Sequence, residues 1–199
     1  ADPGDGGSFN VSSFHGTHVA GTVAASSNDG DGVAGVAWNA RVMPLRVLGE
    51  YGGNDYDTAL AIRYAAGLSN DSGTVPADPA DIINLSLGGS DSSQLLADAV
   101  AAAQQAGVIV IAAAGNERTS LPSFPAAYSG VVSVSAVDIN RELAPYSNFG
   151  STIDIAAPGG NTSRDVNGDG RGDGVLSTAG DDSTGTIRLS YALYQGTSM

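Results

Sequence analysis

The chain alternates short apolar runs with longer amphipathic segments, and it contains no repeat of fixed period. Runs of about four to eight residues rich in Val, Ile, Leu and Ala are typical of strands. In the run that begins at Ile187, apolar side chains recur at every second residue and should share one face of a strand. The pattern predicts strands at residues 42–48, 81–87, 108–114, 131–137, 153–156 and 187–194.

Two segments between these runs have apolar residues at helical spacing. Residues 56–68 form the first, and residues 92–106 form the second, which starts with Ser and Asp as capping candidates and stops at Gly107. Strands that are apolar on both faces and alternate with helices indicate an α/β fold with a mainly parallel sheet. Residues 159–174, rich in Gly, Asp and Asn, predict a long surface loop.

Composition narrows the class of partner. The 199 residues predict one domain, or two small ones, and the net charge of −13 argues against nucleic acid as a partner. All eight basic residues are Arg, and the absence of Cys excludes disulfides and thiol chemistry but leaves the compartment open. The strongest apolar stretch, residues 108–114, is too short to span a membrane, and residues 1–5 do not have the features of a signal peptide.

His15 and His18 are the only histidines, and they lie one turn apart if a helix begins at His15. Zinc is one interpretation of this pair, but the glutamate of a zincin motif is missing and no third ligand is evident. A helix N-terminus favours the neutral imidazole, which suits a general base. A histidine at a helix start without any catalytic role is the ordinary alternative.

Three further fragments carry chemistry only in combination. They are Asn-Leu-Ser-Leu-Gly-Gly at residues 84–89, Ala-Gly-Asn at residues 114–116 and Gly-Thr-Ser-Met at residues 196–199. In this order, after His-Gly-Thr-His-Val-Ala-Gly-Thr at residues 15–22, they resemble the subtilisin-like serine proteases, or subtilases. The resemblance covers essentially the whole chain and is greatest to secreted bacterial members. It implies a three-layer α/β fold, with helices flanking the mainly parallel sheet, and an extracellular location.

The resemblance also implies catalytic roles. Ser198 matches the nucleophile, His15 the base that takes its proton, and Asn116 the side-chain donor of the oxyanion hole. His18 matches the second, non-catalytic histidine of the motif. No residue before His15 matches the triad aspartate, and Asp2 and Asp5 fit better in an acidic loop. We therefore expect residues 1–199 to be a partial catalytic domain, cut at both ends and, alone, a poor protease.

Substrate-binding positions follow from the same resemblance. Ser86, Leu87 and Gly88 match a strand that pairs with the substrate backbone, and Gly52 and Gly53 match the strand opposite. Tyr56 matches the wall of the pocket for the fourth residue before the cut, with an anchor for its own helix as an equal alternative. The primary pocket is expected to be bordered by Ala113, Gly115 and Glu117, beside a cis Phe124–Pro125 peptide bond.

Two Gly-Asp loops are candidates for calcium. The loop that starts at Asp165 fits the first half of an EF-hand, but Leu176 replaces the bidentate glutamate. A second loop, residues 26–32, lies where subtilases commonly carry calcium, although its spacing departs from the best-known pattern. Solvated loops without metal are the alternative for both. The candidate ligands are Asn28, Asp29, Asp31, Asp165, Asn167, Asp169 and Asp173.

The resulting prediction is a secreted serine endopeptidase that acts on polypeptides, is monomeric and meets a propeptide or protein inhibitor, but neither nucleic acid nor membrane. A non-catalytic peptide-binding module with a degenerate subtilase fold is the alternative from another functional class. A nucleotide-binding domain is excluded because no phosphate-loop fingerprint follows any strand.

Overall fold

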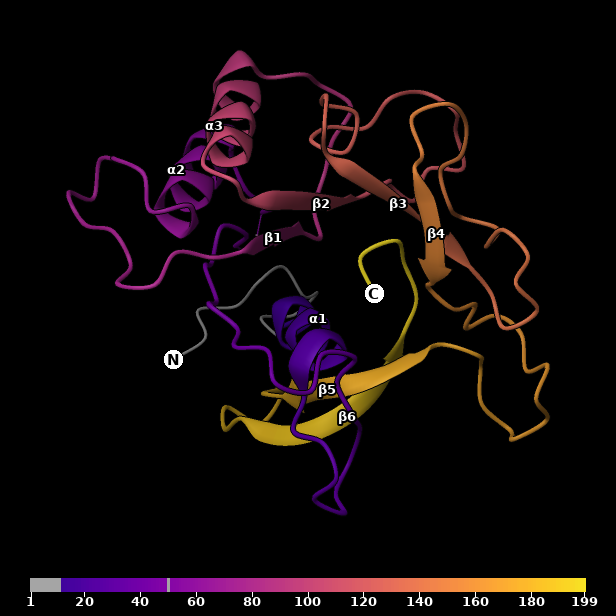
Figure 1. Ribbon diagram of the computed structural model, residues 1–199. Coiled ribbons are helices and arrows are strands. Elements are labelled where there is room, and N and C mark those ends of the chain that lie inside the picture. The colour runs from indigo at the N-terminus through magenta and orange to yellow at the C-terminus, as the bar shows by residue number, and fades with distance from the viewer. Residues whose placement is uncertain (1–11, 50) are drawn as a thin grey trace.

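The computed structural model describes residues 12–49 and 51–199, so Asp2 and Asp5 lie outside the described residues. A four-stranded parallel sheet has the order β1-β2-β3-β4, and an antiparallel pair, β5-β6, lies beside it (Figure 1). The helices are α1 (His15–Ala24), α2 (Asp55–Ala65) and α3 (Gln94–Gln105). The strands are β1 (Ile82–Leu85), β2 (Ile109–Ala113), β3 (Val132–Val137), β4 (Ile155–Pro158), β5 (Val175–Asp181) and β6 (Arg188–Tyr194).

The hydrophobic core lies between the four-stranded sheet and the two helices α2 and α3. Along β1, Ile83 and Leu85 are buried while Ile82 and Asn84 are exposed, as the two-residue period of a strand requires. The inward residues of β1 and β2 pack with Ile62 of α2 and Val100 of α3 in one buried cluster. This arrangement confirms the predicted α/β class and the parallel sheet.

Both core helices begin with a side-chain cap. Asn54 Oδ1 accepts the N–H of Asp57 at 2.8 Å at the start of α2, and Ser93 Oγ accepts the N–H of Leu96 at 3.4 Å at the start of α3. After α3, Gly107 has a φ of 90°, a conformation that favours glycine, and its N–H donates to Gln104 O. The helix therefore ends where the sequence predicts.

Helix α1 packs on the antiparallel pair β5-β6. His18 is fully buried there, stacked on Tyr194 with ring centroids 4.4 Å apart. Its Nε2 lies 3.0 Å from Val175 O and 3.1 Å from Ala192 O, so it bonds to both strands of the pair. His18 is thus a structural residue, consistent with the non-catalytic role that the resemblance implies.

The predicted strand at residues 42–48 is wrong. Residues 42–48 form no strand in the structure. The neighbouring Gly49 forms one isolated β-bridge, with Gly52. Pro44 in the middle has no N–H to donate to a ladder, and Val42 and Leu45 are exposed.

The antiparallel pair differs from expectation in two ways. Strand β5 was not predicted, because the sequence after the Gly-Asp loop has no clear alternation. Strand β6 exists, but Leu189 and Tyr191, on the face that carries the alternating apolar residues, are exposed. On the opposite face, Tyr194 stacks on His18 of α1.

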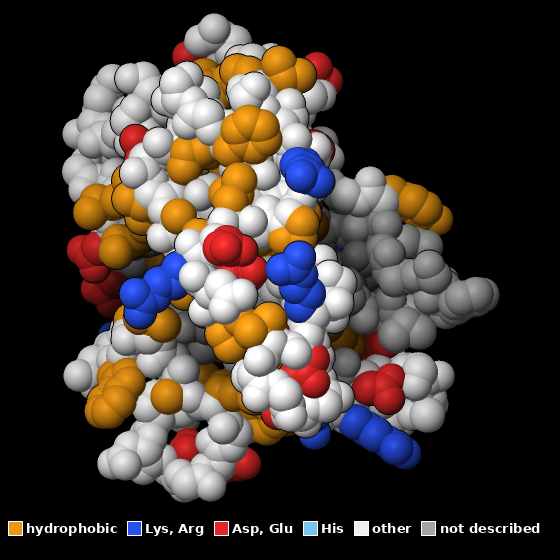
Figure 2. Space-filling view, turned by 90° about the vertical axis from the view of Figure 1, so that its right-hand side faces the viewer, with side chains coloured by type: hydrophobic (Ala, Val, Ile, Leu, Met, Phe, Trp, Pro, Cys, Tyr) orange, Lys and Arg blue, Asp and Glu red, His pale blue; other side chains and the backbone are white. Residues whose placement is uncertain are grey.

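The second face of the four-stranded sheet has a different character. Ile82, Ile109 and Ile155 on it are 54%, 53% and 54% exposed. On the side of the molecule that carries β4, apolar, basic and acidic side chains are interspersed (Figure 2).

Among the described helices, none is long and apolar enough to cross a membrane.

Candidate functional site

The carboxyl ends of the parallel strands bring the candidate residues together. Ser86 follows β1 and Asn116 lies just beyond β2, so both lie at the same edge of the sheet. The segment after β6, residues 195–199, turns back toward this edge (Figure 1). Ligands of open α/β sheets bind at this edge, which makes it the candidate active site.

Asn116 is joined to the residue before Ser198. Its Oδ1 accepts the N–H of Thr197 at 2.9 Å and the Thr197 hydroxyl at 3.1 Å. Thr197 Oγ1 in turn accepts the N–H of Gly115 at 3.1 Å. Both acceptor sites of Asn116 Oδ1 are therefore occupied. The residue is exposed, and its Nδ2 makes no hydrogen bond to any described residue, so Nδ2 can donate to a substrate.

Ser198 is bound to Ser86 by two hydrogen bonds. The Ser86 hydroxyl donates to Ser198 O at 2.8 Å, and the Ser198 hydroxyl donates to Ser86 O at 3.3 Å. The second bond is long and therefore weak. The structure thus places Ser198 beside the end of β1 and next to Asn116. Only a weak hydrogen bond holds its hydroxyl.

A tyrosine supports the same segment from the other side. Tyr146 Oη donates to Gly159 O at 2.8 Å and to Gly160 O at 2.9 Å, and Gly159 O also accepts the N–H of Gly196 at 3.0 Å. Burial raises the pKa of Tyr146 to about 12, a rise that a backbone hydrogen bond with Gly196 opposes. The residue two positions before Ser198 is therefore fixed to the end of β4.

His15 begins α1, as the sequence predicts. Its N–H donates to Ser13 Oγ at 3.2 Å, and Ser13 O accepts the Tyr194 hydroxyl at 2.8 Å. The hydrogen bond between Ser13 and Tyr194 therefore connects the start of α1 to the end of β6. The segment that contains Ser198 follows β6 directly. The side-by-side placement of the His15 ring and the Ser198 hydroxyl stays a prediction.

The substrate-strand candidates after β1 are partly accessible. Ser86 and Leu87 are half-buried, Gly88 is exposed, and Gly89 forms a bridge with Phe124. A Cβ on Gly88 would lie 3.2 Å from Phe124 O, so a larger residue would crowd this approach. The Phe124–Pro125 peptide bond is cis, as expected. Ala113 is buried at the end of β2, and Gly115 follows it with a φ of 103°.

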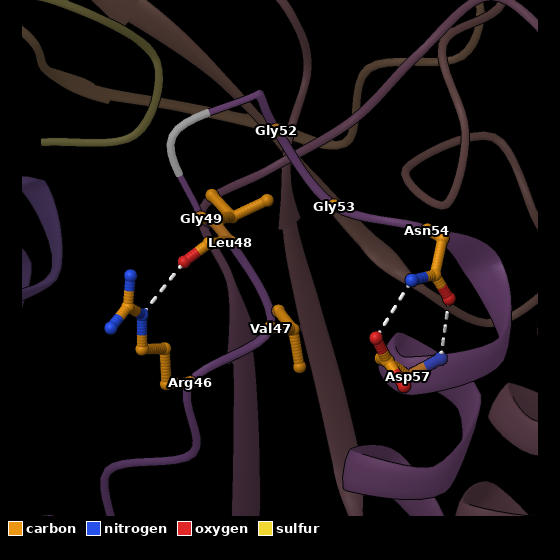
Figure 3. A pocket seen from close by; sticks show the side chains of 8 residues that line it. All are labelled: Arg46, Val47, Leu48, Gly49, Gly52, Gly53, Asn54 and Asp57. Carbon is orange, nitrogen blue, oxygen red and sulfur yellow. Dashed lines mark hydrogen bonds between the residues drawn. The ribbon is translucent and has the colours of Figure 1, made fainter. Parts of the chain in front are cut away.

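The opposite candidates line a hollow of about 410 Å³ (Figure 3). Gly52 has a φ of 89°, and a Cβ on Gly53 would lie 2.5 Å from Val47 O, so both positions favour glycine. Tyr56 lies outside this lining, half-exposed on α2, and its hydroxyl donates to Asp71, which raises its pKa. The lining residues are Arg46, Val47, Leu48, Gly49, Gly52, Gly53, Asn54 and Asp57.

The metal candidates fit a cation only in part. Asp165 accepts N–H groups from Gly168, Asp169 and Gly170, and Asp173 is buried with an Oδ1 that has no hydrogen-bond partner among the described residues. Across residues 12–49 and 51–199, however, no three His, Cys, Asp or Glu side chains lie close enough to hold a metal ion.

The second loop has a looser arrangement. Asn28 has a φ of 64° and Asp29 Oδ1 accepts the N–H of Asp31 at 3.2 Å, on an exposed turn. These contacts describe a turn held by its own side chains, which a solvated loop explains as well as a metal does.

Sequence reasoning missed three residues at this site. Thr197 lies inside the Gly-Thr-Ser-Met motif, so it could have been singled out as a partner of Asn116. Tyr146 and Asn148 lie in the segment between β3 and β4, far along the chain from the residues that they contact. No local pattern marks them, because their contacts exist only after folding.

Comparisons with known proteins identify relatives of this chain. A sequence model of the subtilase family, peptidase S8, matches residues 2–199. The chain is 43% identical over 190 residues to an extracellular protease of Xanthomonas campestris and 39% identical over 193 residues to an extracellular basic protease of Dichelobacter nodosus. Each match covers 94% of this chain but only 30% and 29% of those relatives, so the chain spans about a third of their length.

A solved structure has the same fold. The match to a protease from Pseudoalteromonas arctica PAMC 21717 has a TM-score of 0.91 and 46% identity, and it covers all of this chain and 60% of that one. With the family match over nearly every residue, this establishes the family. The chain belongs to the subtilases.

Proposed function

We propose that this chain carries the nucleophile, the general base and the oxyanion hole of a serine endopeptidase. The observation that carries the proposal is the bonding of Asn116 to Thr197, the residue before Ser198. This bonding keeps a side-chain amide donor close to the backbone N–H and the hydroxyl of Ser198, at the carboxyl ends of the parallel strands. The chain belongs to the subtilase family, and the relatives reported above are named proteases. Both findings support peptide-bond hydrolysis as the reaction.

In the proposed mechanism, the Ser198 hydroxyl leaves its long bond to Ser86 O and donates to His15. The neutral imidazole takes the proton as Ser198 Oγ attacks the carbonyl carbon of the scissile bond. The carbonyl oxygen becomes an oxyanion, which accepts hydrogen bonds from Asn116 Nδ2 and from the N–H of Ser198. His15 then gives the proton to the leaving amine, and water hydrolyses the acyl-enzyme by the same steps.

The proposed substrate is an extended polypeptide. Its backbone pairs with residues 86–88 on one side and with Gly52 and Gly53 on the other, where small residues allow a close approach. Tyr56 borders the pocket for the fourth residue before the cut, while Ala113 and Gly115 border the pocket next to the cut. No residue of the chain is proposed as the triad aspartate.

Calcium is proposed as a structural ion rather than a catalytic one. The support is the buried Oδ1 of Asp173, since a carboxylate oxygen without a hydrogen bond is a ready cation ligand. Asp165, Asn167 and Asp169 are the candidates for the remaining oxygen ligands. Asn28, Asp29 and Asp31 are the candidates for a second ion.

We also propose that the protein is secreted, acts as a monomer and meets a propeptide or protein inhibitor. The names of the Xanthomonas and Dichelobacter relatives support the location.

The function is tested with the full-length protein, because residues 1–199 include no candidate for the triad aspartate, by hydrolysis of casein and of a peptide p-nitroanilide. Ser198→Ala should lower kcat by on the order of 10⁶, the loss that the nucleophile's removal causes in subtilisin. Ser151→Ala, on an exposed turn, should leave the rate unchanged. A purified protein that binds peptide but hydrolyses none, or a Ser198→Ala variant as fast as the parent, would instead favour a binding module.

A further inference from the structure

We propose that Asn148 is a positioning residue that fixes the loop carrying Asn116 and thereby aims the oxyanion donor. The proposal rests on the proposed function, because it assumes that Asn116 contacts the oxyanion. Asn148 lies between β3 and β4 and is only 2% exposed. It has no role in the mechanism above, yet its side chain is bonded to the residues on both sides of Asn116.

The hydrogen bonds of Asn148 are complete. Its Oδ1 accepts the N–H groups of Glu117 at 3.0 Å and Thr119 at 3.1 Å. Its Nδ2 donates to Ala114 O at 2.9 Å and to Glu117 Oε2 at 2.8 Å. Since a primary amide offers two donors and two acceptor sites, the side chain has no capacity left.

The main chain of the same segment adds three bonds. The N–H of Asn148 donates to Gly115 O at 3.0 Å, the N–H of Phe149 donates to Thr119 O at 3.0 Å, and Tyr146 O accepts the N–H of Arg118 at 2.9 Å. Residues 115–119 belong to neither a helix nor a strand, so no regular ladder satisfies their backbone groups. The amide of Asn148, together with these backbone bonds, holds the loop in place of a ladder.

The loop leaves no space for a different arrangement. Gly115 has a φ of 103°, and a Cβ on it would lie 2.4 Å from Asn148 Nδ2 and 2.5 Å from Glu117 Oε2. The backbone of Gly115 thus packs directly on the amide of Asn148. Asn116 follows directly, so the residues on both sides of it are bonded to Asn148 while its own Oδ1 is held by Thr197. Two supports therefore determine where Nδ2 points.

Asparagine suits this position better than its close analogues. Aspartate would keep both acceptors but lose the donors to Ala114 O and Glu117, and it would place a second carboxylate against that of Glu117. Serine is too short to reach residues on both sides of Asn116. Preorganised donors stabilise a transition state because they need no rearrangement at the moment of reaction. A loosened loop should therefore lower kcat more than it raises KM.

The test is a double-mutant cycle on the active protein. Asn148→Asp and Asn148→Ser are each made alone and together with Asn116→Ala, and kcat and KM are measured below the Tm of every variant. In the parent, Asn148→Asp should lower kcat by about tenfold or more, with KM changed less than about threefold. With Asn116 already removed, the same change should lower kcat by less than about twofold.

Asn161→Asp is the matched control, because Asn161 is also a buried asparagine whose Oδ1 accepts a neighbouring hydroxyl, that of Ser163. It should leave kcat close to the parent value. Equal losses of kcat with and without Asn116, or a folded Asn148 variant with parental kcat, would overturn the positioning role. A parent without any hydrolysis would refute the proposed function instead. If Asn148→Asp does not fold, Asn148→Ser supplies the cycle.

Discussion

Asn116 and Thr197 are bonded through the N–H and the hydroxyl of the threonine. The N–H and the hydroxyl of Thr197 each donate to Asn116 Oδ1, at 2.9 and 3.1 Å. This contact joins residues 81 positions apart and fixes the orientation of the asparagine amide. Its consequence is that the proposed nucleophile and the proposed oxyanion donor move as one unit, which suits a site that must not rearrange during the reaction.

The first prediction concerns that contact. Thr197→Val keeps the shape but removes the hydroxyl, so Asn116 loses one bond and the N–H of Gly115 loses its acceptor. A hydrogen bond contributes about 0.5–1.5 kcal/mol net, so the loss of the bond to Asn116 should by itself lower kcat about two- to thirteenfold. Thr197→Ser keeps the hydroxyl and should stay within about twofold of the parent. Steady-state kinetics on a peptide substrate decides, and equal kcat in the two variants would contradict the assignment.

The second prediction is that Gly115→Ala destabilises the protein. Its φ of 103° is unfavourable for alanine, and the added Cβ would meet Asn148 Nδ2 at 2.4 Å. The strain of about 1–3 kcal/mol should lower Tm by several degrees and reduce activity. Gly107→Ala is the control, since its φ is also positive but its Cβ would contact nothing within 4 Å. A Tm loss no larger than that of Gly107→Ala would show that the loop has room.

The third prediction concerns alkaline pH. Burial raises the pKa of Tyr146 to about 12 from an ordinary value of 10.0, so the folded state keeps the proton more tightly than the unfolded state. This contribution to stability is complete below pH 10 and is lost as the pH rises toward 12. Tyr146→Phe should therefore flatten the fall of Tm across that range. Tyr51→Phe, at an exposed position, should not, and parallel curves for Tyr146→Phe and the parent would argue against the effect.

The fourth prediction tests calcium. An ion that binds only the folded state stabilises it by about 2.7 kcal/mol at a hundredfold excess over its Kd, which corresponds to a Tm rise of about 5–10 °C. Excess chelator should remove this rise, and Asp173→Asn should reduce it if the ion lies in the Asp165 loop. A full calcium response in Asp173→Asn together with its loss in Asp29→Asn would place the ion in residues 26–32. Identical Tm values with calcium and with chelator would refute the metal.

Much of the fold could be predicted because its signals are local. The apolar runs at β1 to β4 and the cap at Ser93 each lie within a few residues of the element that they define. The same holds for His15 and Asn116, whose motifs sit where a helix begins and a strand ends. For these elements, the interactions that determine the structure are close in sequence.

The errors have non-local causes. In residues 187–194 both faces carry apolar side chains, and the stack of His18 on Tyr194 joins residues from opposite ends of the chain, which no local pattern reveals. Residues 42–48 are as apolar as a strand, but Pro44 interrupts any ladder. Asn148 has no motif at all, since five of its hydrogen bonds reach residues about 30 positions earlier. Such residues are recognised only from the folded chain.

The most direct test of the account is covalent labelling of Ser198. The full-length protein is treated with a serine-directed fluorophosphonate, because residues 1–199 include no candidate for the triad aspartate, and the modified peptide is identified by mass spectrometry. Ser198 should be labelled stoichiometrically and selectively, and His15→Ala should react far more slowly, because no imidazole then takes the hydroxyl proton. Absence of labelling at Ser198 in the folded protein, or an equal rate in His15→Ala, would contradict the assignment of the nucleophile and its base.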